Sequence, residues 1–452
     1  MERFALQKLI DWKDSRYRKP LILRGARQVG KTWLLKEFGK TCYENIAYFN
    51  FDEHEEYKQF FENTKDIRRI LDNLTFASGS EINPGSTLII FDEIQECPKA
   101  LNTLKYFYEN ANEYHVVCAG SLLGISLAKP SSFPVGMVNF LNIYPMTFTE
   151  FLLACGNINL KNYLDSINII EEIPDAFFNP LCEKLKIYFV TGGMPEVVRR
   201  WAEEKRVEGV QETLSDIISS YEKDFAKHTD TKDIPKINMI WKSVPSQLAK
   251  ENKKFLYKVV KEGARAREYE DALDWLCEAD LLTKIFRISK PALPLSAYDD
   301  LSAFKIYLMD VGIFRKVVSL APSAITEGNR LFTEFKGALT ENFILQSLKP
   351  EFEVTPRYWA TDNPKYEVDF VIQRENDIIP IEVKSSTDKN NTSLRKFKEI
   401  FSSEYEDKQL LRIRFSLRNL CLDKDVLNIP LFMADYTNRL ISLAKKSKNT
   451  LA

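Results

Sequence analysis

A glycine-rich segment early in the chain has the residue types and spacing that bind a polyphosphate. It is a G-x-x-x-x-G-K-[ST] motif made of Gly25, Ala26, Arg27, Gln28, Val29, Gly30, Lys31 and Thr32. The glycines permit a tight turn whose N–H groups face phosphate oxygens, and a helix starting near Lys31 adds positive potential. Lys31 can reach the β- and γ-phosphates, and Thr32 can bind Mg²⁺. The motif predicts a site for ATP and Mg²⁺.

Two adjacent carboxylates form a second chemical pattern about 60 residues later. Asp92 and Glu93 end the apolar run 87–91. At the carboxyl end of a buried strand, Asp92 can orient Mg²⁺ and its waters, and Glu93 can polarise the water that attacks a γ-phosphate. Ser121 follows another apolar run and is placed to sense the γ-phosphate, although a serine that caps a helix remains the alternative.

The last third of the chain contains a third group of charged residues. Glu382 and Lys384 are two positions apart in an expected strand and therefore share one face. Asp369 lies in the expected neighbouring strand, and Glu341 lies in a helix before both. Because carboxylates are hard oxygen ligands that suit Mg²⁺, Glu341, Asp369 and Glu382 are candidate metal ligands. The alternative is an amphipathic hairpin with paired surface charges.

The elements that position the first two patterns follow from hydrophobic runs. Apolar residues at helical spacing predict a helix within residues 1–19, and three short apolar runs predict buried strands at 21–23, 46–51 and 116–121. Residues 53–75 are expected to be helical, and 83–86 to form a turn. Strands that alternate with helices indicate an α/β fold with a parallel sheet and right-handed crossovers.

Composition limits the class of protein. The chain has 452 residues, of which 44% are hydrophobic and 28% charged, with a formal net charge of −1. This length predicts two to four domains, and the near-neutral charge does not by itself indicate nucleic-acid binding. The seven scattered cysteines include no C-x-x-C pair, which favours reduced thiols over a zinc site. No long apolar segment or secretory signal is evident, so we expect a cytoplasmic protein without a membrane span.

Three segments beyond the phosphate loop resemble a large prokaryotic family of AAA-superfamily ATPases. They are residues 92–96, 120–124 and 141–151. This resemblance implies a P-loop NTPase sheet followed by a helical lid. Residues 188–196 are similar to the Gly-x-Pro turn of such lids, which implies that Pro195 lies against the adenine. A simple turn that begins a helix is the alternative for Pro195.

The middle of the chain predicts a winged-helix-like connector. Helical spacing over 269–282 is followed by an alternating strand at 283–288. Lysines and arginines concentrate between 250 and 267 and could follow a DNA backbone. However, acidic residues at 268–274 load the expected recognition helix with negative charge, which opposes entry into the major groove. DNA is therefore one candidate partner, and a rigid extension of the lid is the alternative.

The strand pair around Asp369 and Glu382 resembles the core of PD-(D/E)XK nucleases. The resemblance implies a restriction-endonuclease-like α/β domain in which Asp369, Glu382 and Lys384 are catalytic. Lys384 would stabilise charge on the phosphorus or help to orient water. Val368 stands where the family pattern has a proline. A domain that keeps this fold but only binds a partner is the alternative.

These patterns predict four parts: a P-loop ATPase domain at 1–180, a helical lid at 181–235, a winged-helix-like domain at 236–300 and a nuclease-like domain at 301–452. We expect an ATP-hydrolysing enzyme with Glu93 and Lys31 as catalytic residues. Its nucleotide state would regulate the C-terminal domain, which would process DNA. The competing hypothesis is a switch or scaffold ATPase whose inactive C-terminal domain binds a protein partner. The sequence leaves the oligomeric state open.

Overall fold

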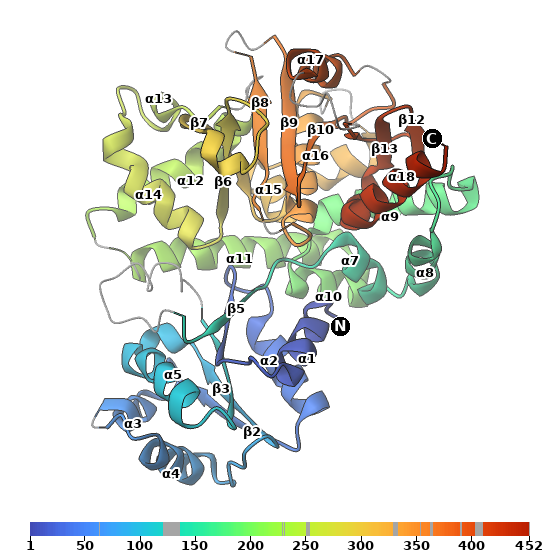
Figure 1. The fold of residues 1–452 in the computed structure, drawn as a ribbon. Coiled ribbons are helices and arrows are strands. Elements are labelled where there is room, and N and C mark those ends of the chain that lie inside the picture. The colour runs from blue at the N-terminus through green and yellow to red at the C-terminus, as the bar shows by residue number, and fades with distance from the viewer. Residues whose placement is uncertain are drawn as a thin grey trace. The chain divides into compact units, whose positions relative to one another are not determined.

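The computed structural model describes residues 1–451 apart from short gaps (Figure 1). The gaps are residues 63, 121–135, 228, 230, 250–253, 329–332, 353, 362–364, 389–390 and 403–409. Contacts divide the chain into two compact units. The smaller unit contains Glu2–Tyr144 and Trp275–Leu281, and the larger unit contains Pro145–Asp274 and Leu282–Ala452.

The smaller unit is a five-stranded parallel sheet with helices around it. Its strands are β1 (Leu21–Arg24), β2 (Asn45–Asn50), β3 (Thr87–Asp92), β4 (His115–Ala119) and β5 (Asn139–Asn142), in the order β2-β3-β4-β1-β5. Its helices are α1 (Ala5–Asp14), α2 (Lys31–Cys42), α3 (Gln59–Glu62), α4 (Ile67–Ser78) and α5 (Pro98–Asn110), with short 3-10 turns η1 (Glu55–Lys58) and η2 (Ile94–Glu96). The predicted parallel α/β sheet is confirmed.

Burial explains why these strands are almost uninterrupted apolar runs. β3 and β4 are buried along their whole length, since helices cover both faces of a parallel sheet. Phe49, Phe51, Phe91 and Phe107 pack edge-to-face or tilted in one core cluster. This rigid core holds the carboxyl ends of β1 and β3, where the phosphate loop and the two carboxylates lie.

The larger unit contains most of the helices of the described residues. They are α7 (Phe148–Ala154), α8 (Ile158–Ser166), α9 (Asp175–Thr191), α10 (Pro195–Glu204), α11 (Val207–Lys227), α12 (Ile234–Leu248), α13 (Tyr257–Val260), α14 (Ala266–Glu278, whose last residues fall in the smaller unit), α15 (Val311–Val317), α16 (Thr333–Leu348), α17 (Thr392–Ile400) and α18 (Thr437–Leu451). Short helical turns are η3 (Leu295–Tyr298), η4 (Ala324–Gly328) and η7 (Leu431–Tyr436). Among the helices of the described residues, none has the length and apolar composition needed to cross a membrane.

A mixed sheet organises the rest of the larger unit (Figure 1). Its strands are β6 (Leu282–Ile288), β7 (Asp299–Leu308), β8 (Arg357–Ala360), β9 (Glu367–Arg374), β10 (Asp377–Val383), β11 (Arg412–Ser416), β12 (Cys421–Asp423) and β13 (Val426–Pro430), in the order β12-β13-β11-β10-β9-β8-β6-β7. β9 and β10 form the predicted antiparallel hairpin, and β10, β11 and β13 run parallel to one another.

The expected middle region shares this sheet. The helices α12, α13 and α14 precede the antiparallel pair β6 and β7, which is the predicted order of helices and strand. However, β6 also pairs with β8, so the strands of the connector continue the C-terminal sheet. The predicted boundary between residues 300 and 301 falls inside β7. The division into four domains remains a prediction.

A half-buried carboxylate against the start of α18 gives the larger unit a pH-dependent contact. Glu351 accepts hydrogen bonds from the backbone N–H groups of Thr437 (3.1 Å) and Asn438 (2.7 Å), which caps the first turn of the helix. Burial nevertheless raises the pKa of Glu351 to about 8. Between pH 4.5 and 8 the folded chain therefore holds more protons at this position than the unfolded chain.

Stability is accordingly expected to fall as pH rises across that window, by about 2–4 kcal/mol for this group. Glu351→Gln mimics the protonated form and should remove most of this pH dependence. Urea unfolding of the larger unit at pH 5 and pH 8 measures the difference. Glu375→Gln, a change of an exposed carboxylate, should keep the wild-type dependence. An unchanged slope in Glu351→Gln would exclude Glu351 as its source.

Candidate functional site

The phosphate loop joins β1 to α2 and requires two glycines. Gly25 has φ of +138°, and a Cβ there would lie 2.1 Å from the carbonyl oxygen of Ile143. Gly30 has φ of +91° at the N-cap of α2. Only glycine adopts these conformations without strain. The turn therefore aims the backbone of Ala26, Arg27, Gln28 and Val29 around the N-terminus of α2, where an anion is favoured.

Lys31 is held against the loop by two hydrogen bonds. Its Nζ donates to the carbonyl oxygens of Gly25 and Ala26, each at 2.8 Å, and the residue is 7% exposed. Burial lowers the pKa of Lys31 to about 8, although the carboxylate of Glu93 partly opposes this. A polyphosphate in the loop would supply anionic oxygens to this ammonium group and so favour its charged form.

Thr32 and Asp92 meet as the motifs predict. The Thr32 hydroxyl donates to Asp92 Oδ2 at 2.8 Å, and the Tyr48 hydroxyl donates to the same oxygen at 2.8 Å. Burial raises the pKa of Asp92 despite these hydrogen bonds. A hydroxyl and a carboxylate beside a phosphate loop are the oxygen donors that Mg²⁺ takes in this arrangement. The residues present therefore fit the implied metal ion.

Glu93 follows directly and is held in position. It adopts a left-handed conformation with φ of +48°, and its Oε2 accepts a hydrogen bond from Gln95 Nε2 at 2.6 Å. A non-glycine residue in this region of φ/ψ space costs of order 1 kcal/mol and often occurs at functional sites. The side chain is partly exposed, unlike that of Asp92, so water can reach its carboxylate.

Two residues of this site were not found by sequence reasoning. Arg3 donates to the carbonyl oxygens of Val29 (2.9 Å) and Tyr144 (2.7 Å), which ties the phosphate loop to the segment after β5. No local pattern marks Arg3. Tyr48 could have been predicted from the strand pattern. Asn50 of β2 pairs with Asp92 of β3, and Tyr48, two residues before Asn50, lies on the same face of β2.

Ser121 and Pro195 are the two remaining predicted nucleotide contacts. Ser121 lies outside the described residues. Pro195 is the first residue of α10 in the larger unit. The turn before it is fixed by contacts of that unit: Gly193 N–H donates to Asp310 Oδ2 at 2.6 Å, and a Cβ on Gly193 would lie 2.1 Å from the carbonyl oxygen of Met146. The adenine contact of Pro195 stays a prediction.

The C-terminal candidate residues lie on α16, β9 and β10, with Lys384 directly after β10. Lys384 Nζ is 2.9 Å from Glu382 Oε1, and the hydrogen bond to Glu382 raises the pKa of Lys384 against the effect of burial. Asp369 Oδ2 accepts the backbone N–H of Val383 at 2.7 Å, so Asp369 lies beside β10. Glu382 is only 4% exposed, and its Oε2 has no hydrogen-bond partner among the described residues. A buried polar atom without a protein partner is a candidate contact for a ligand.

A buried lysine that sequence reasoning missed stands among the same carboxylates. Lys305 of β7 is fully buried and forms an ion pair with Glu367 of β9. Burial alone would lower the pKa of Lys305, but the charges of Glu367, Glu341 and Asp369 outweigh it and raise the pKa. The hydroxyl of buried Tyr307 donates to Glu341 Oε2 at 3.2 Å. Glu341 therefore already has partners on β7.

The C-terminal carboxylates already have an ammonium group and a hydroxyl group as partners, which limits their fit to a metal ion. Among the described residues, no group of three or more His, Cys, Asp or Glu side chains is placed to hold a metal ion. The carboxylates of Glu341, Asp369 and Glu382 are suitable donors, yet Lys305 and Tyr307 interact with Glu341 where a shared cation would be needed. Their assignment as metal ligands stays a prediction.

Comparisons with known families divide the chain into three stretches. Residues 17–152 match the family described as "AAA domain". Residues 182–324 match "Domain of unknown function (DUF8612)", and residues 336–432 match "Domain of unknown function (DUF4143)". No curated protein matches the chain. None of the matched families confirms a nuclease fold at the C-terminal end.

Several solved structures are distantly similar to this chain over more than half of its length. A Walker-type ATPase of Pyrococcus abyssi is 12% identical, with a TM-score of 0.45, over 70% of this chain and 95% of that one. Aeropyrum pernix ORC1, solved in complex with DNA, is 13% identical, with a TM-score of 0.30, over 71% of this chain and 93% of that one. The Thermotoga maritima RuvB Holliday junction branch migration motor is 15% identical, with a TM-score of 0.31, over 63% of this chain and 89% of that one. These likenesses are too distant to transfer a function.

The family match and the local geometry agree for the N-terminal part of the chain. The matched range contains the phosphate loop, Thr32, Asp92 and Glu93, all of which lie in the smaller unit. Residues 17–152 therefore match the AAA domain family and contain a complete phosphate loop, and two regions that match families of unknown function follow.

Proposed function

We propose that this protein hydrolyses ATP with Mg²⁺ and that its nucleotide state regulates the C-terminal domain. The observation that carries the proposal is the joint placement of Lys31, Thr32, Asp92 and Glu93 at the carboxyl ends of β1 and β3. Each residue type matches one requirement of phosphoryl transfer: charge neutralisation, metal binding and activation of water.

The residues would divide the work as follows. N–H groups of the loop and the Lys31 ammonium group bind the β- and γ-phosphates. Thr32 and Asp92 would hold Mg²⁺, which when bound supplies charge neutralisation between the β- and γ-phosphates. Glu93 accepts a hydrogen bond from the attacking water and takes up its proton. Arg3 and Tyr48 keep the loop and Asp92 in place through the contacts described above.

Lys31→Ala is expected to weaken ATP binding by roughly 10- to 100-fold, because a hydrogen bond to a charged group contributes about 1.5–3 kcal/mol. Titration with a fluorescent ATP analogue in the presence of Mg²⁺ measures the affinity. Lys40→Ala, which changes an exposed lysine on the same helix, is the matched control and should bind normally. Equal affinity in both variants would remove the phosphate-loop assignment.

For the C-terminal domain we propose a nuclease-like site at Asp369, Glu382 and Lys384, with DNA as the candidate substrate. The unpartnered Oε2 of buried Glu382 and the adjacent Lys384 ammonium group support a site for a ligand. Lys261, Arg265 and Arg267 are exposed and could contact phosphates, whereas exposed Glu268 and Glu270 on α14 would repel them.

A second candidate is a partner-binding domain without catalysis. It is favoured by Lys305, whose buried charge is matched by Glu367 and lies close enough to Glu341 and Asp369 to interact with both. Because the ammonium group of Lys305 already compensates the negative charge of these carboxylates, a metal ion is not required there for charge balance. In this case the nucleotide state of the ATPase domain would change the affinity for a protein partner.

Cleavage of plasmid and linear DNA in Mg²⁺, with and without ATP, separates the two candidates. For the nuclease-like candidate, Asp369→Ala and Lys384→Ala should each reduce cleavage by about 10²-fold. Lys445→Ala, a lysine of α18 paired with Asp377, is the control for general effects of removing charge. If the wild-type chain does not cleave DNA and shifts no DNA on gels at low or high salt, the partner-binding domain is favoured.

A further inference from the structure

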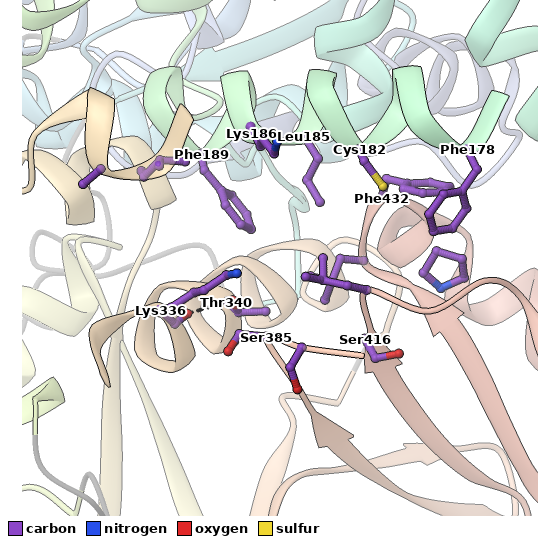
Figure 2. A pocket seen from close by; sticks show the side chains of 16 residues that line it. Phe178, Cys182, Leu185, Lys186, Phe189, Lys336, Thr340, Ser385, Ser416 and Phe432 are labelled. Carbon is purple, nitrogen blue, oxygen red and sulfur yellow. Dashed lines mark hydrogen bonds between the residues drawn. The ribbon is translucent and has the colours of Figure 1, made fainter. Parts of the chain in front are cut away.

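A cavity of about 340 Å³ lies within the larger unit beside α9 (Figure 2). Its opposite wall is formed near the carboxyl ends of the parallel strands β10, β11 and β13, at Ser385, Ser416 and Pro430. In open α/β sheets this end of the strands is where ligands bind. The volume is also within the range of small-molecule sites. The cavity is lined from both of the regions that match families of unknown function.

The wall on the α9 side is apolar and aromatic. Phe178, Leu185 and Phe189 line the cavity from α9, with Phe178 two turns before Leu185 and Phe189 one turn after it. Phe432 of η7 packs edge-to-face on Phe178 with ring centroids 5.2 Å apart. Aromatic side chains hold planar rings well through offset or edge contacts. This wall favours a ligand with an apolar, ring-containing body.

The side of the cavity opposite α9 carries the positive charge of Lys336. Lys336 and Thr340 are one turn apart on α16, and Figure 2 shows both side chains at the cavity. No ion pair joins Lys336 to another described residue, whereas Lys186, the second lysine of the lining, is paired with Glu183 at 2.7 Å. None of the described lining residues is acidic. The cavity therefore has an electrostatic preference for an anion.

We propose that this cavity binds a small aromatic anion, with its ring against Phe189 and Leu185 and its acidic group at Lys336. The half-buried Lys336 and the exposed Ser386 provide access from solvent. Ser385 and Ser386 directly follow Lys384, so an occupant would contact the segment that leaves the nuclease-like strand. The proposal does not depend on ATP hydrolysis or DNA cleavage.

The test uses 8-anilino-1-naphthalenesulfonate, an aromatic sulfonate whose fluorescence rises in apolar sites, with the full chain. We expect saturable binding at one site, weakened about ten-fold by Lys336→Glu, since loss of a charged contact of typical strength has this effect. Lys184→Glu makes the same charge change on α9 at a residue outside the lining and should bind as the wild type does. The uncharged analogue N-phenyl-1-naphthylamine should bind more weakly than the sulfonate.

Cys182 locates the bound probe independently of these substitutions. Its thiol lines the cavity, and burial raises its pKa to about 11, so alkylation is expected to be slow. The sulfonate should slow it further, whereas alkylation of the partly exposed Cys421 should not change, as read by mass spectrometry of peptides. Unprotected Cys182, equal affinities of the two charge-reversal variants, or equal binding of the neutral analogue would each overturn the proposal.

Discussion

Glu93→Gln is expected to lower the rate of ATP hydrolysis by about 10²- to 10⁴-fold while leaving ATP affinity nearly unchanged. The amide keeps the size of the side chain and an oxygen that can accept the hydrogen bond now donated by Gln95. It cannot take up a proton from the attacking water. Because Thr32, Asp92 and Lys31 are untouched, binding of Mg²⁺ and phosphate should persist. Phosphate release under saturating ATP measures the loss in kcat.

The matched control is Glu96→Gln, which removes the same charge three residues later in η2. If Glu93 acts on water, only the first variant should lose turnover. A fall in both would point to the local electrostatic field instead. Full activity in Glu93→Gln, with normal ATP affinity, would require another base and would contradict the role assigned to Glu93.

The nucleotide site was largely predictable because its signals are local. Gly25 and Gly30 must be glycines for backbone reasons, and Asp92 and Glu93 end a strand whose burial was evident from its apolar run. Parallel strands with helices between them follow from the alternation of the same runs. Arg3 could not be predicted, since its contacts with Val29 and Tyr144 depend on how the chain returns after β5.

The C-terminal site was predicted only in part, for a physical reason. The hairpin of β9 and β10 and the helix α16 are local, so Asp369, Glu382 and Glu341 were assigned to the correct elements. Lys305 lies on β7, which joins the sheet at its far end, four strands from β10 in the hydrogen-bonded order. Its sequence neighbours Phe304 and Ile306 give no indication that a charged group is fully buried between them. Long-range pairing decided its environment.

Lys305→Met is expected to destabilise the larger unit by about 3–5 kcal/mol. The substitution removes the cation from a fully buried position and leaves Glu367 without its ion-pair partner, near Glu341 and Asp369. Carboxylates buried together repel one another and lose hydration, so the penalty includes their desolvation as well as the lost attraction. Urea unfolding at pH 7, followed by tryptophan fluorescence, to which Trp359 of β8 beside β9 contributes, measures the change.

The double variant Lys305→Met/Glu367→Gln should recover most of this loss, since it removes the unpaired charge as well. Lys445→Met, which breaks the partly exposed pair with Asp377, should cost no more than about 1 kcal/mol. If Lys305→Met instead keeps wild-type stability and gains tight Mg²⁺ binding, its ammonium group occupies a position that a metal ion can take, and the nuclease-like candidate is strengthened. If it loses stability and gains no metal affinity, Lys305 is a structural counter-ion, and the carboxylates around it belong to a domain that binds without cleaving.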